Sequence, residues 1–417
     1  MEIKRDVYLN KLIQKKHNGL VKVVTGVRRC GKSYLLFVLF KDYLFNEGVT
    51  PDHIIEMAFD ARENKKYRNP DVFDAYAKEK LIDDKMYYFL LDEVQLLGDF
   101  ESVLNGLIRH KNADVYVTGS NSKFLSKDVI TEFRGRGDEI NLRPLSFAEF
   151  MAVYDGDRYR GFEDFILYGG LPPVVLLPDA EEKIEFLERL FRETYISDIV
   201  GRNRLRNVSE MEELLDILAS NIGTLTNPQK LQNTFRSVKK SRITSVTISK
   251  YLGYLEESYL IESAKRFDIR GKAYIETPLK YYYVDLGLRN ARINFRQVEM
   301  THSMENVIYN ELRMRKFNVD VGCVTISERN EKKVPVRKHL EVDFVCNKGS
   351  KRYYIQSAYA ILDKAKQIQE ERPLKHINDS FKKVIITRDT PRVQYTEDGF
   401  LMMNVFEFLL NPDSLDY

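Results

Sequence analysis

The sequence predicts an α/β protein built around a parallel β-sheet, with further domains toward the C-terminus. Strand-like and helix-like segments alternate over residues 20–141, and a glycine-containing loop joins the first of these strands to a helical segment. A second mixture of strands and helices occupies residues 291–417. Strands that alternate with helices imply a parallel sheet covered on both faces.

Composition indicates a globular protein of several domains. A chain of 417 residues is too long for one ordinary core, so two to four domains are expected. Hydrophobic residues make up 43% and charged residues 30%, and the mean hydropathy is −0.39. The net charge of +3 is too small to indicate a nucleic-acid partner without local clustering.

The sequence contains no clear targeting or metal-binding signal. No run approaches the roughly 18 apolar residues of a membrane helix, and charged residues follow Met1 where a secretory signal would be apolar. Cys30, Cys323 and Cys346 match no zinc spacing, and the six histidines, His17 and His302 among them, form no ligand pattern. A cytoplasmic protein with no membrane contact is therefore expected.

The expected elements follow in chain order. Strands are predicted at residues 20–25, 54–59, 86–91 and 115–118, and helices at residues 33–45, 69–80 and 100–110. Residues 146–206 are mainly helical, with breaks at Gly169-Gly170 and Pro172-Pro173. Helices followed by a short β-hairpin are predicted for residues 207–290, and the run Tyr281-Tyr282-Tyr283 is expected in a core strand.

The strongest motif is GVRRCGKS over residues 26–33, a complete G-x-x-x-x-G-K-S between a strand and a helix. Its glycines allow backbone N–H groups to face phosphate oxygens, and the helix N-terminus adds positive potential. Lys32 is expected to reach the β- and γ-phosphates and Ser33 to be a magnesium ligand. The predicted ATP-binding residues are Gly26, Val27, Arg28, Arg29, Cys30, Gly31, Lys32, Ser33 and Tyr34.

A second motif, YYFLLDE over residues 87–93, is an apolar strand that ends in two carboxylates. This pattern fits a Walker B motif, in which Asp92 holds Mg²⁺ through its water shell and Glu93 polarises the attacking water. The alternative is that the two acids only cap the next helix.

Further candidates follow the last of these strands. Asn121, with Ser120 next, is predicted to sense the γ-phosphate, although a plain turn is nearly as good an explanation. Arg134 and Arg136 lie on the glycine-rich segment 133–137 and are candidates to reach a neighbouring subunit's nucleotide. The alternative is a solvated basic loop; a trans arginine would require a homo-oligomer.

These motifs resemble those of a known family. GVRRCGKS, LLDEVQ, VTGSNS, FRGRGDEINLRPLSFAEF and YGGLPPVV, with ENVIYNEL, EVDF and YIQSA near the C-terminus, are similar to prokaryotic AAA+ ATPases that carry a C-terminal domain of unknown function. The resemblance implies an AAA+ P-loop core (1–145), a helical lid (146–206), a winged helix-turn-helix (207–290) and a PD-(D/E)xK nuclease-like domain (291–417).

The expected winged helix contains an amphipathic segment, residues 244–260, with Val246, Ile248, Leu252, Leu255 and Leu260 available for burial. Basic residues cluster in this region and are candidates to contact DNA phosphates. They are Arg236, Lys239, Lys240, Arg242, Lys250, Arg266, Arg270 and Lys272. Winged helices also dock proteins, so a protein-docking role for this segment stays open.

The C-terminal domain has the partial pattern of a metal-dependent nuclease. Glu305 and Asp343 fit the metal-holding carboxylates of such a site, and Gln356 stands where a third acid is expected. Ala358 cannot replace the usual lysine, so a degenerate domain retained for binding is predicted. Glu341 is expected to be a solvated strand residue.

The leading hypothesis is an AAA+ ATPase that hydrolyses ATP with Mg²⁺ and drives changes in appended DNA- or protein-binding domains. One alternative is a slow-turnover signalling NTPase that acts on protein partners. Another is an ATP-dependent nucleic-acid processing enzyme with an active nuclease domain.

Overall fold

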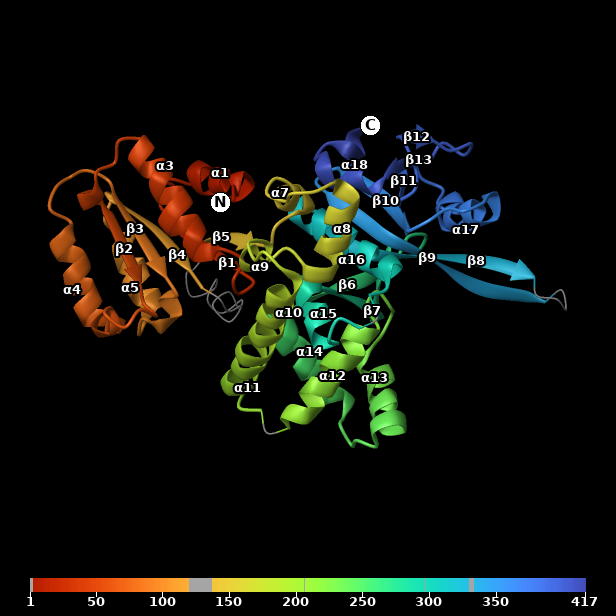
Figure 1. Ribbon diagram of the computed structural model, residues 1–417, viewed down its shortest axis with the longest axis horizontal. Coiled ribbons are helices and arrows are strands. Elements are labelled where there is room, and N and C mark those ends of the chain that lie inside the picture. Colours follow the sequence, from red (N-terminus) through yellow and green to blue (C-terminus); the bar gives the residue numbers. More distant parts are fainter. Residues whose placement is uncertain (1–2, 120–136, 206, 297, 330–333) are drawn as a thin grey trace. The chain divides into compact units, whose positions relative to one another are not determined.

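A computed structural model describes residues 3–119, 137–205, 207–296, 298–329 and 334–417 (Figure 1). The chain divides into two compact units. Unit 1 comprises Met1–Pro144 with Glu257–Tyr259, and unit 2 comprises Leu145–Glu256 with Leu260–Tyr417. No helix within the described ranges is long and apolar enough to cross a membrane.

Unit 1 is built on a five-stranded sheet with the order β2-β3-β4-β1-β5, in which every neighbouring pair is parallel. Its strands are β1 (Val21–Gly26), β2 (Ile54–Ala58), β3 (Tyr87–Asp92), β4 (Ala113–Thr118) and β5 (Gly137–Leu142). Its described α-helices are α1 (Asp6–Gln14), α2 (Lys32–Tyr34), α3 (Lys41–Asn46), α4 (Pro70–Lys80) and α5 (Phe100–Leu107). A π-helical stretch, Leu35–Phe40, joins α2 to α3. The α/β class with a parallel sheet is confirmed.

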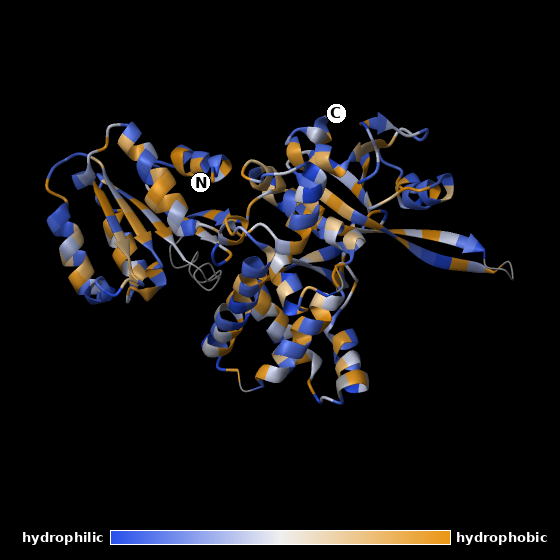
Figure 2. Ribbon diagram, in the orientation of Figure 1, coloured by the Kyte–Doolittle hydropathy of each residue, from blue (hydrophilic) through white to orange (hydrophobic). Residues whose placement is uncertain are grey.

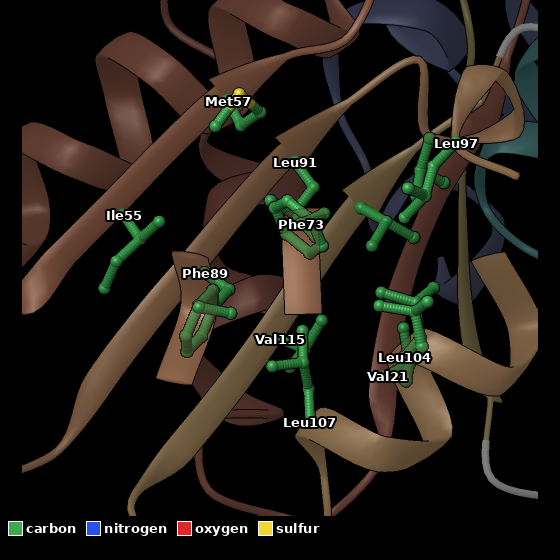
Figure 3. Close-up of a cluster of buried hydrophobic side chains, with 14 of the residues drawn as sticks. Val21, Ile55, Met57, Phe73, Phe89, Leu91, Leu97, Leu104, Leu107 and Val115 are labelled. Carbon is green, nitrogen blue, oxygen red and sulfur yellow. The ribbon is translucent and has the colours of Figure 1, made fainter. Parts of the chain in front are cut away.

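Successive side chains of each strand point to opposite faces of this sheet. Figure 2 shows the strands as largely hydrophobic. One face packs on α4 and α5, where Phe89, Leu91 and Val115 meet Phe73 and Leu104 (Figure 3). On the other face, Tyr116 of β4 contacts Phe40 with ring centroids 4.5 Å apart. The central strands β1 and β3 are buried throughout, as expected for strands covered on both sides.

Unit 2 contains a mixed eight-stranded sheet with the order β12-β13-β11-β10-β9-β8-β6-β7. The strands are β6 (Ile261–Asp268), β7 (Ala273–Tyr283), β8 (Asn318–Arg329), β9 (Pro335–Lys348), β10 (Lys351–Ala358), β11 (Lys382–Thr387), β12 (Gln394–Tyr395) and β13 (Leu401–Asn404). The core on one side of this sheet includes Val324, Val342 and Ile385 with Leu374 of α17 (Lys364–Lys375).

In chain order, the helices of unit 2 lie before the strands of this sheet, between them and after the last one. They are α7 (Phe147–Met151), α8 (Arg158–Tyr168), α9 (Pro172–Val175), α10 (Ala180–Arg189), α11 (Ser197–Asn203), α12 (Val208–Ser220), α13 (Pro228–Thr234), α14 (Ser245–Glu257), α15 (Leu286–Arg292), α16 (Met300–Met314), α17 (Lys364–Lys375) and α18 (Val405–Leu410). The N-cap Asp285 of α15 also accepts a hydrogen bond from the Gly170 amide at 2.8 Å. This bond ties the Gly169-Gly170 break to the start of α15.

The hairpin expected as the wing of a winged helix belongs to the eight-stranded sheet. After α14, strands β6 and β7 pair antiparallel, and β6 also pairs in parallel with β8 through Arg266↔Val321 and Asp268↔Cys323. A boundary between residues 290 and 291 therefore does not separate two sheets. Val246 was expected to be buried, but its side chain is 65% exposed, whereas Ile248, Leu252 and Leu255 of α14 are buried.

Candidate functional site

The glycine-rich loop follows β1 and has the curled backbone that the motif requires. Gly26 and Gly31 have φ angles of 132° and 98°, a region that favours glycine. A Cβ atom added to Gly26 would lie 1.8 Å from the Leu142 carbonyl oxygen of β5. The loop is thus held against the neighbouring strand, with backbone amides before α2 available for an anion.

Lys32 begins α2, and its side chain turns back into the loop. Its Nζ atom donates hydrogen bonds of 3.0 Å to the carbonyl oxygens of both Gly26 and Val27, and the residue is buried. The ammonium therefore lies beside the loop backbone, where the motif places the phosphates.

The other predicted nucleotide-binding residues fall into two groups. Val27 and Cys30 are buried, and burial raises the pKa of the Cys30 thiol. Arg28 and Tyr34 are more accessible, and Arg29 is exposed with a φ of 64°. Val27 and Cys30 thus anchor the loop, whereas side chains of the second group face outward.

A hydroxyl–carboxylate cluster lies at the carboxyl edge of the sheet. Ser33 Oγ donates to Asp92 Oδ2 at 2.7 Å, and Thr118 Oγ1, at the end of β4, donates to Asp92 Oδ1. The sheet order explains this contact, because β4 lies between β3 and the loop-bearing strand β1. Burial raises the pKa of Asp92, although the hydrogen bonds from Thr118 and Ser33 oppose this shift.

Glu93 lies at the turn just after β3. Its backbone has a φ of 50°, its amide donates to Thr118 Oγ1 at 3.0 Å, and its carboxylate accepts a hydrogen bond from Gln95 Nε2. Thr118 therefore connects both acidic residues of the motif. Thr118 was not predicted; the available signal was a single hydroxyl residue ending an apolar strand. Asn121, Ser120, Arg134 and Arg136 lie outside the described residues.

Hydroxyl and carboxylate oxygens are the donors that Mg²⁺ prefers. Ser33 and Asp92 bring one of each together at 2.7 Å beside the loop, so these residues fit the predicted magnesium site. Because few protein ligands are present, such an ion would retain water and bind the phosphates as well, as is usual for Mg²⁺.

The predicted nuclease-like residues meet in unit 2 around a lysine. Glu305 of α16 accepts a 2.8 Å contact from Lys280 Nζ of β7, and Asp343 of β9 lies 3.8 Å from the same ammonium. Glu341 contacts Lys280 at 2.7 Å, so its interpretation as a merely solvated residue is wrong. Gln356 donates instead to Glu370 of α17 at 3.3 Å.

A metal ion does not fit this second site as it stands. The ammonium of Lys280 lies among the three carboxylates, and no group of three or more histidine, cysteine or acidic residues in the described part of the chain is arranged to hold a metal. Lys280 was not predicted because it comes from β7, whereas the nuclease pattern directs attention to Ala358 of β10.

The basic residues expected to contact DNA do not all present free charges. Arg270 donates to the Thr325 and His376 carbonyl oxygens at 3.0 and 3.1 Å, and Arg266 donates to Cys323 Sγ. The exposed members of the group are Arg236, Lys240, Arg242 and Lys250, in or just before α14, and Arg270 and Lys272 in the turn between β6 and β7. The surface available for phosphates therefore includes α14, the segment before it and this turn.

The parallel sheet, the curled glycine loop and the carboxylate edge define a P-loop nucleotide-binding domain, and residues 18–151 match the family model of an AAA domain. Residues 159–299 match a domain of unknown function. The chain belongs to the same family as an uncharacterised protein of Haemophilus influenzae, to which it is 34% identical over 415 residues, covering 98% of each chain.

A second relative is an uncharacterised protein of Methanocaldococcus jannaschii, 27% identical over 420 residues, with 97% of this chain and 87% of the relative covered. Among solved structures, the Aeropyrum pernix ORC1 protein in complex with DNA matches with a TM-score of 0.30 and 14% identity. That match covers 70% of this chain and 93% of the other. A TM-score this low establishes no shared fold.

Proposed function

We propose that the protein hydrolyses ATP in unit 1 and uses its nucleotide state to change the conformation or contacts of unit 2. The observation that carries this proposal is the bonded series Ser33–Asp92–Thr118–Glu93, which joins the glycine-rich loop to the end of β3. Such a connection brings the loop and both acids of the motif to one edge of the sheet, which supports this proposal. An AAA domain supports nucleotide binding in general terms.

Each residue has a distinct part in the proposed reaction. The loop amides and Lys32 bind the phosphates, and Ser33 and Asp92 hold Mg²⁺, which when bound neutralises phosphate charge. Glu93 orients a water molecule toward the γ-phosphorus and accepts its proton as the bond to the β-phosphate oxygen breaks. Thr118 bonds to both the Asp92 carboxylate and the Glu93 amide and so keeps these two residues in position.

The decisive experiment measures steady-state ATP hydrolysis and nucleotide affinity in wild type, Lys32→Ala and Glu93→Gln. Lys32→Ala should lose nucleotide affinity, whereas Glu93→Gln should bind ATP normally and lose most turnover. Equal turnover in Glu93→Gln and wild type would remove Glu93 from the reaction. ATP binding unaffected by Lys32→Ala would place the nucleotide elsewhere.

DNA is the partner proposed for unit 2, on the strength of the exposed basic side chains around α14. The same ATPase assay with duplex and single-stranded DNA tests it. Stimulation that falls in an Arg242→Ala, Lys250→Ala double variant and at higher salt would support a phosphate contact. Turnover that DNA leaves unchanged would favour a protein partner instead.

We also propose that the protein acts as a homo-oligomer in which Arg134 or Arg136 reaches a neighbour's nucleotide. This proposal rests on the sequence alone. Mixing Arg136→Ala with Glu93→Gln, and separately Arg134→Ala with Glu93→Gln, should restore part of the activity for the arginine that acts in trans. No recovery in either mixture would count against a shared site.

A further inference from the structure

A buried lysine lies among three carboxylates in unit 2. Lys280 is 3% exposed, and its ammonium contacts Glu341 at 2.7 Å, Glu305 at 2.8 Å and Asp343 at 3.8 Å. The acids come from α16 and β9, and the lysine comes from β7. The cluster is therefore assembled by the fold and not by neighbours in sequence.

The rest of the cluster is fixed by further hydrogen bonds. Tyr282 OH donates to Glu305 Oε1 at 2.7 Å, and the Ser357 amide donates to Asp343 Oδ2 at 2.8 Å. Glu305 and Asp343 are buried, whereas the Glu341 side chain is 38% exposed. The two inner carboxylates thus each accept a hydrogen bond from a group other than the lysine.

The number of acidic neighbours distinguishes Lys280 from a lysine in an ordinary buried ion pair. Lys22 in unit 1 is also buried, but among the described residues its ammonium forms an ion pair with Asp114 alone, and burial lowers its pKa. Burial has the same effect on Lys280, yet Glu305, Asp343 and Glu341 outweigh it and raise the pKa of Lys280. Burial and Glu305 raise the pKa of Asp343. The three carboxyl groups can thus carry more negative charge than the single ammonium group can balance.

An excess of fixed carboxylates is the environment that oxygen-preferring divalent cations occupy in proteins. Here the centre of that environment is filled by the lysine ammonium. We propose that Lys280 is the resident cation of this site and takes the place of a divalent metal ion. Unit 2 then binds no metal at Glu305 and Asp343 while Lys280 is present, and it performs no metal-dependent cleavage there.

The test replaces Lys280 with methionine, which keeps a long side chain and removes the charge. Lys280→Met leaves the carboxylates without a cation, so it should lower the melting temperature of unit 2. Added Mn²⁺ should then recover several degrees, because a ligand that binds only the folded state stabilises it. Electron paramagnetic resonance should count one bound Mn²⁺ more than in wild type, in nucleotide-free buffer.

Lys22→Met is the matched control. This substitution also removes a buried lysine, but it leaves one paired carboxylate behind. The variant should therefore have a lower melting temperature, and Mn²⁺ should raise that temperature no more than it does in wild type. The double variant Lys280→Met, Asp343→Asn should lose the Mn²⁺ response. If Lys280→Met does not fold without metal, refolding that succeeds only with Mn²⁺ supports the proposal, and failure in both conditions counts against it.

Two results would overturn the proposal. One is a folded Lys280→Met protein whose melting temperature does not respond to Mn²⁺. The other is Mn²⁺-dependent DNA cleavage by the Glu93→Gln protein that Asp343→Asn abolishes, since such cleavage would show a working metal beside Lys280.

Discussion

A single hydroxyl, that of Thr118, holds both acidic residues of the proposed ATPase site. It donates to the buried carboxylate of Asp92 and accepts from the Glu93 amide. Hydrogen bonds to charged groups contribute more to stability than neutral ones, and a buried partner left without its bond is costly. Thr118 therefore holds the Asp92 carboxylate and the Glu93 backbone in position relative to each other.

Thr118→Val keeps the shape of the side chain and removes this link. We expect turnover to fall about tenfold or more, since the loss of a charge-assisted hydrogen bond amounts to about 1.5–3 kcal/mol. ATP affinity should change less, because Lys32 and the loop are untouched. Turnover and nucleotide affinity would be measured together, with the buried Thr387→Val in unit 2 as the control. An unchanged turnover would deny Thr118 a positioning role.

Asp285 should make the stability of unit 2 depend on pH. Burial raises its pKa from 3.8 to about 6, although hydrogen bonds from the Gly170 and Leu288 amides oppose the shift. The folded state therefore holds a proton that the unfolded state releases between these values. The associated stability is present below about pH 4 and is lost as the pH rises through about 6.

The expected loss between pH 4 and pH 7.5 is about 2–3 kcal/mol, from a shift of about two pKa units. Urea unfolding of wild type and Asp285→Asn at both pH values would measure it, because asparagine does not titrate. The difference between the two proteins should change with pH in this direction. A constant difference would refute the assignment.

Candidate site residues could be predicted from the sequence where they lie next to one another in the chain. The loop and the two acids at the end of β3 are local patterns, and the structure brings them together through Ser33 and Asp92. Thr118 and Lys280 were missed because each meets its partners across distant parts of the chain, Thr118 at Asp92 and Lys280 at Glu305. No local spacing encodes such contacts. Glu341 was misread for the same reason.

At the scale of elements, the contact between the glycine-rich loop and β5 limits what Gly26 can become. A methyl group there would overlap the Leu142 carbonyl oxygen, and the φ of 132° is unfavourable for any other residue. The loop or β5 would have to move. Either displacement would disturb the amides that are proposed to face the phosphates.

Gly26→Ala should therefore lose most ATP affinity while unit 2 keeps its stability. Gly201→Ala in α11 is the control, because a Cβ atom there meets open space and alanine favours a helix. Isothermal titration with ATP, followed by thermal unfolding, would separate the two effects. Normal affinity in Gly26→Ala would mean that the loop tolerates a different conformation.

Most elements of unit 1 were predicted within a residue or two, since the strands are apolar runs and the helices carry clear starts such as the Asn69 cap of α4. Helix α1 and strand β5 were not predicted. β5 is an edge strand whose sequence, GDEINL, carries two charges and only partial burial. In unit 2 the β6–β7 hairpin was recognised, but its parallel partner β8 lies too far along the chain for local patterns to reveal.

At the scale of the whole molecule, the two units have separate hydrophobic cores. Phe89 belongs to the core of unit 1 and Ile385 to a core of unit 2, and both are fully buried. Removing a buried phenylalanine side chain costs about 3–5 kcal/mol, and a buried isoleucine about 2–5 kcal/mol. Each substitution should therefore lower first the stability of the unit that contains the residue.

We expect Phe89→Ala to increase hydrogen exchange throughout Met1–Pro144 and to leave the strands of the eight-stranded sheet protected. Ile385→Ala should do the reverse. Exchange followed by mass spectrometry in each variant would show the pattern. Equal loss of protection across both units after either substitution would mean that they unfold as one cooperative body.

The pairing of β6 with β8 determines where this chain can be cut. The match to the domain of unknown function ends at residue 299, but β8 begins at Asn318. A fragment that stops at residue 299 would expose the edge of β6 and would leave Lys280 buried without Glu305, Glu341 and Asp343. Open strand edges and unpaired buried charges both promote aggregation or misfolding. Expression trials should therefore separate the chain near residue 144 and keep everything after it intact.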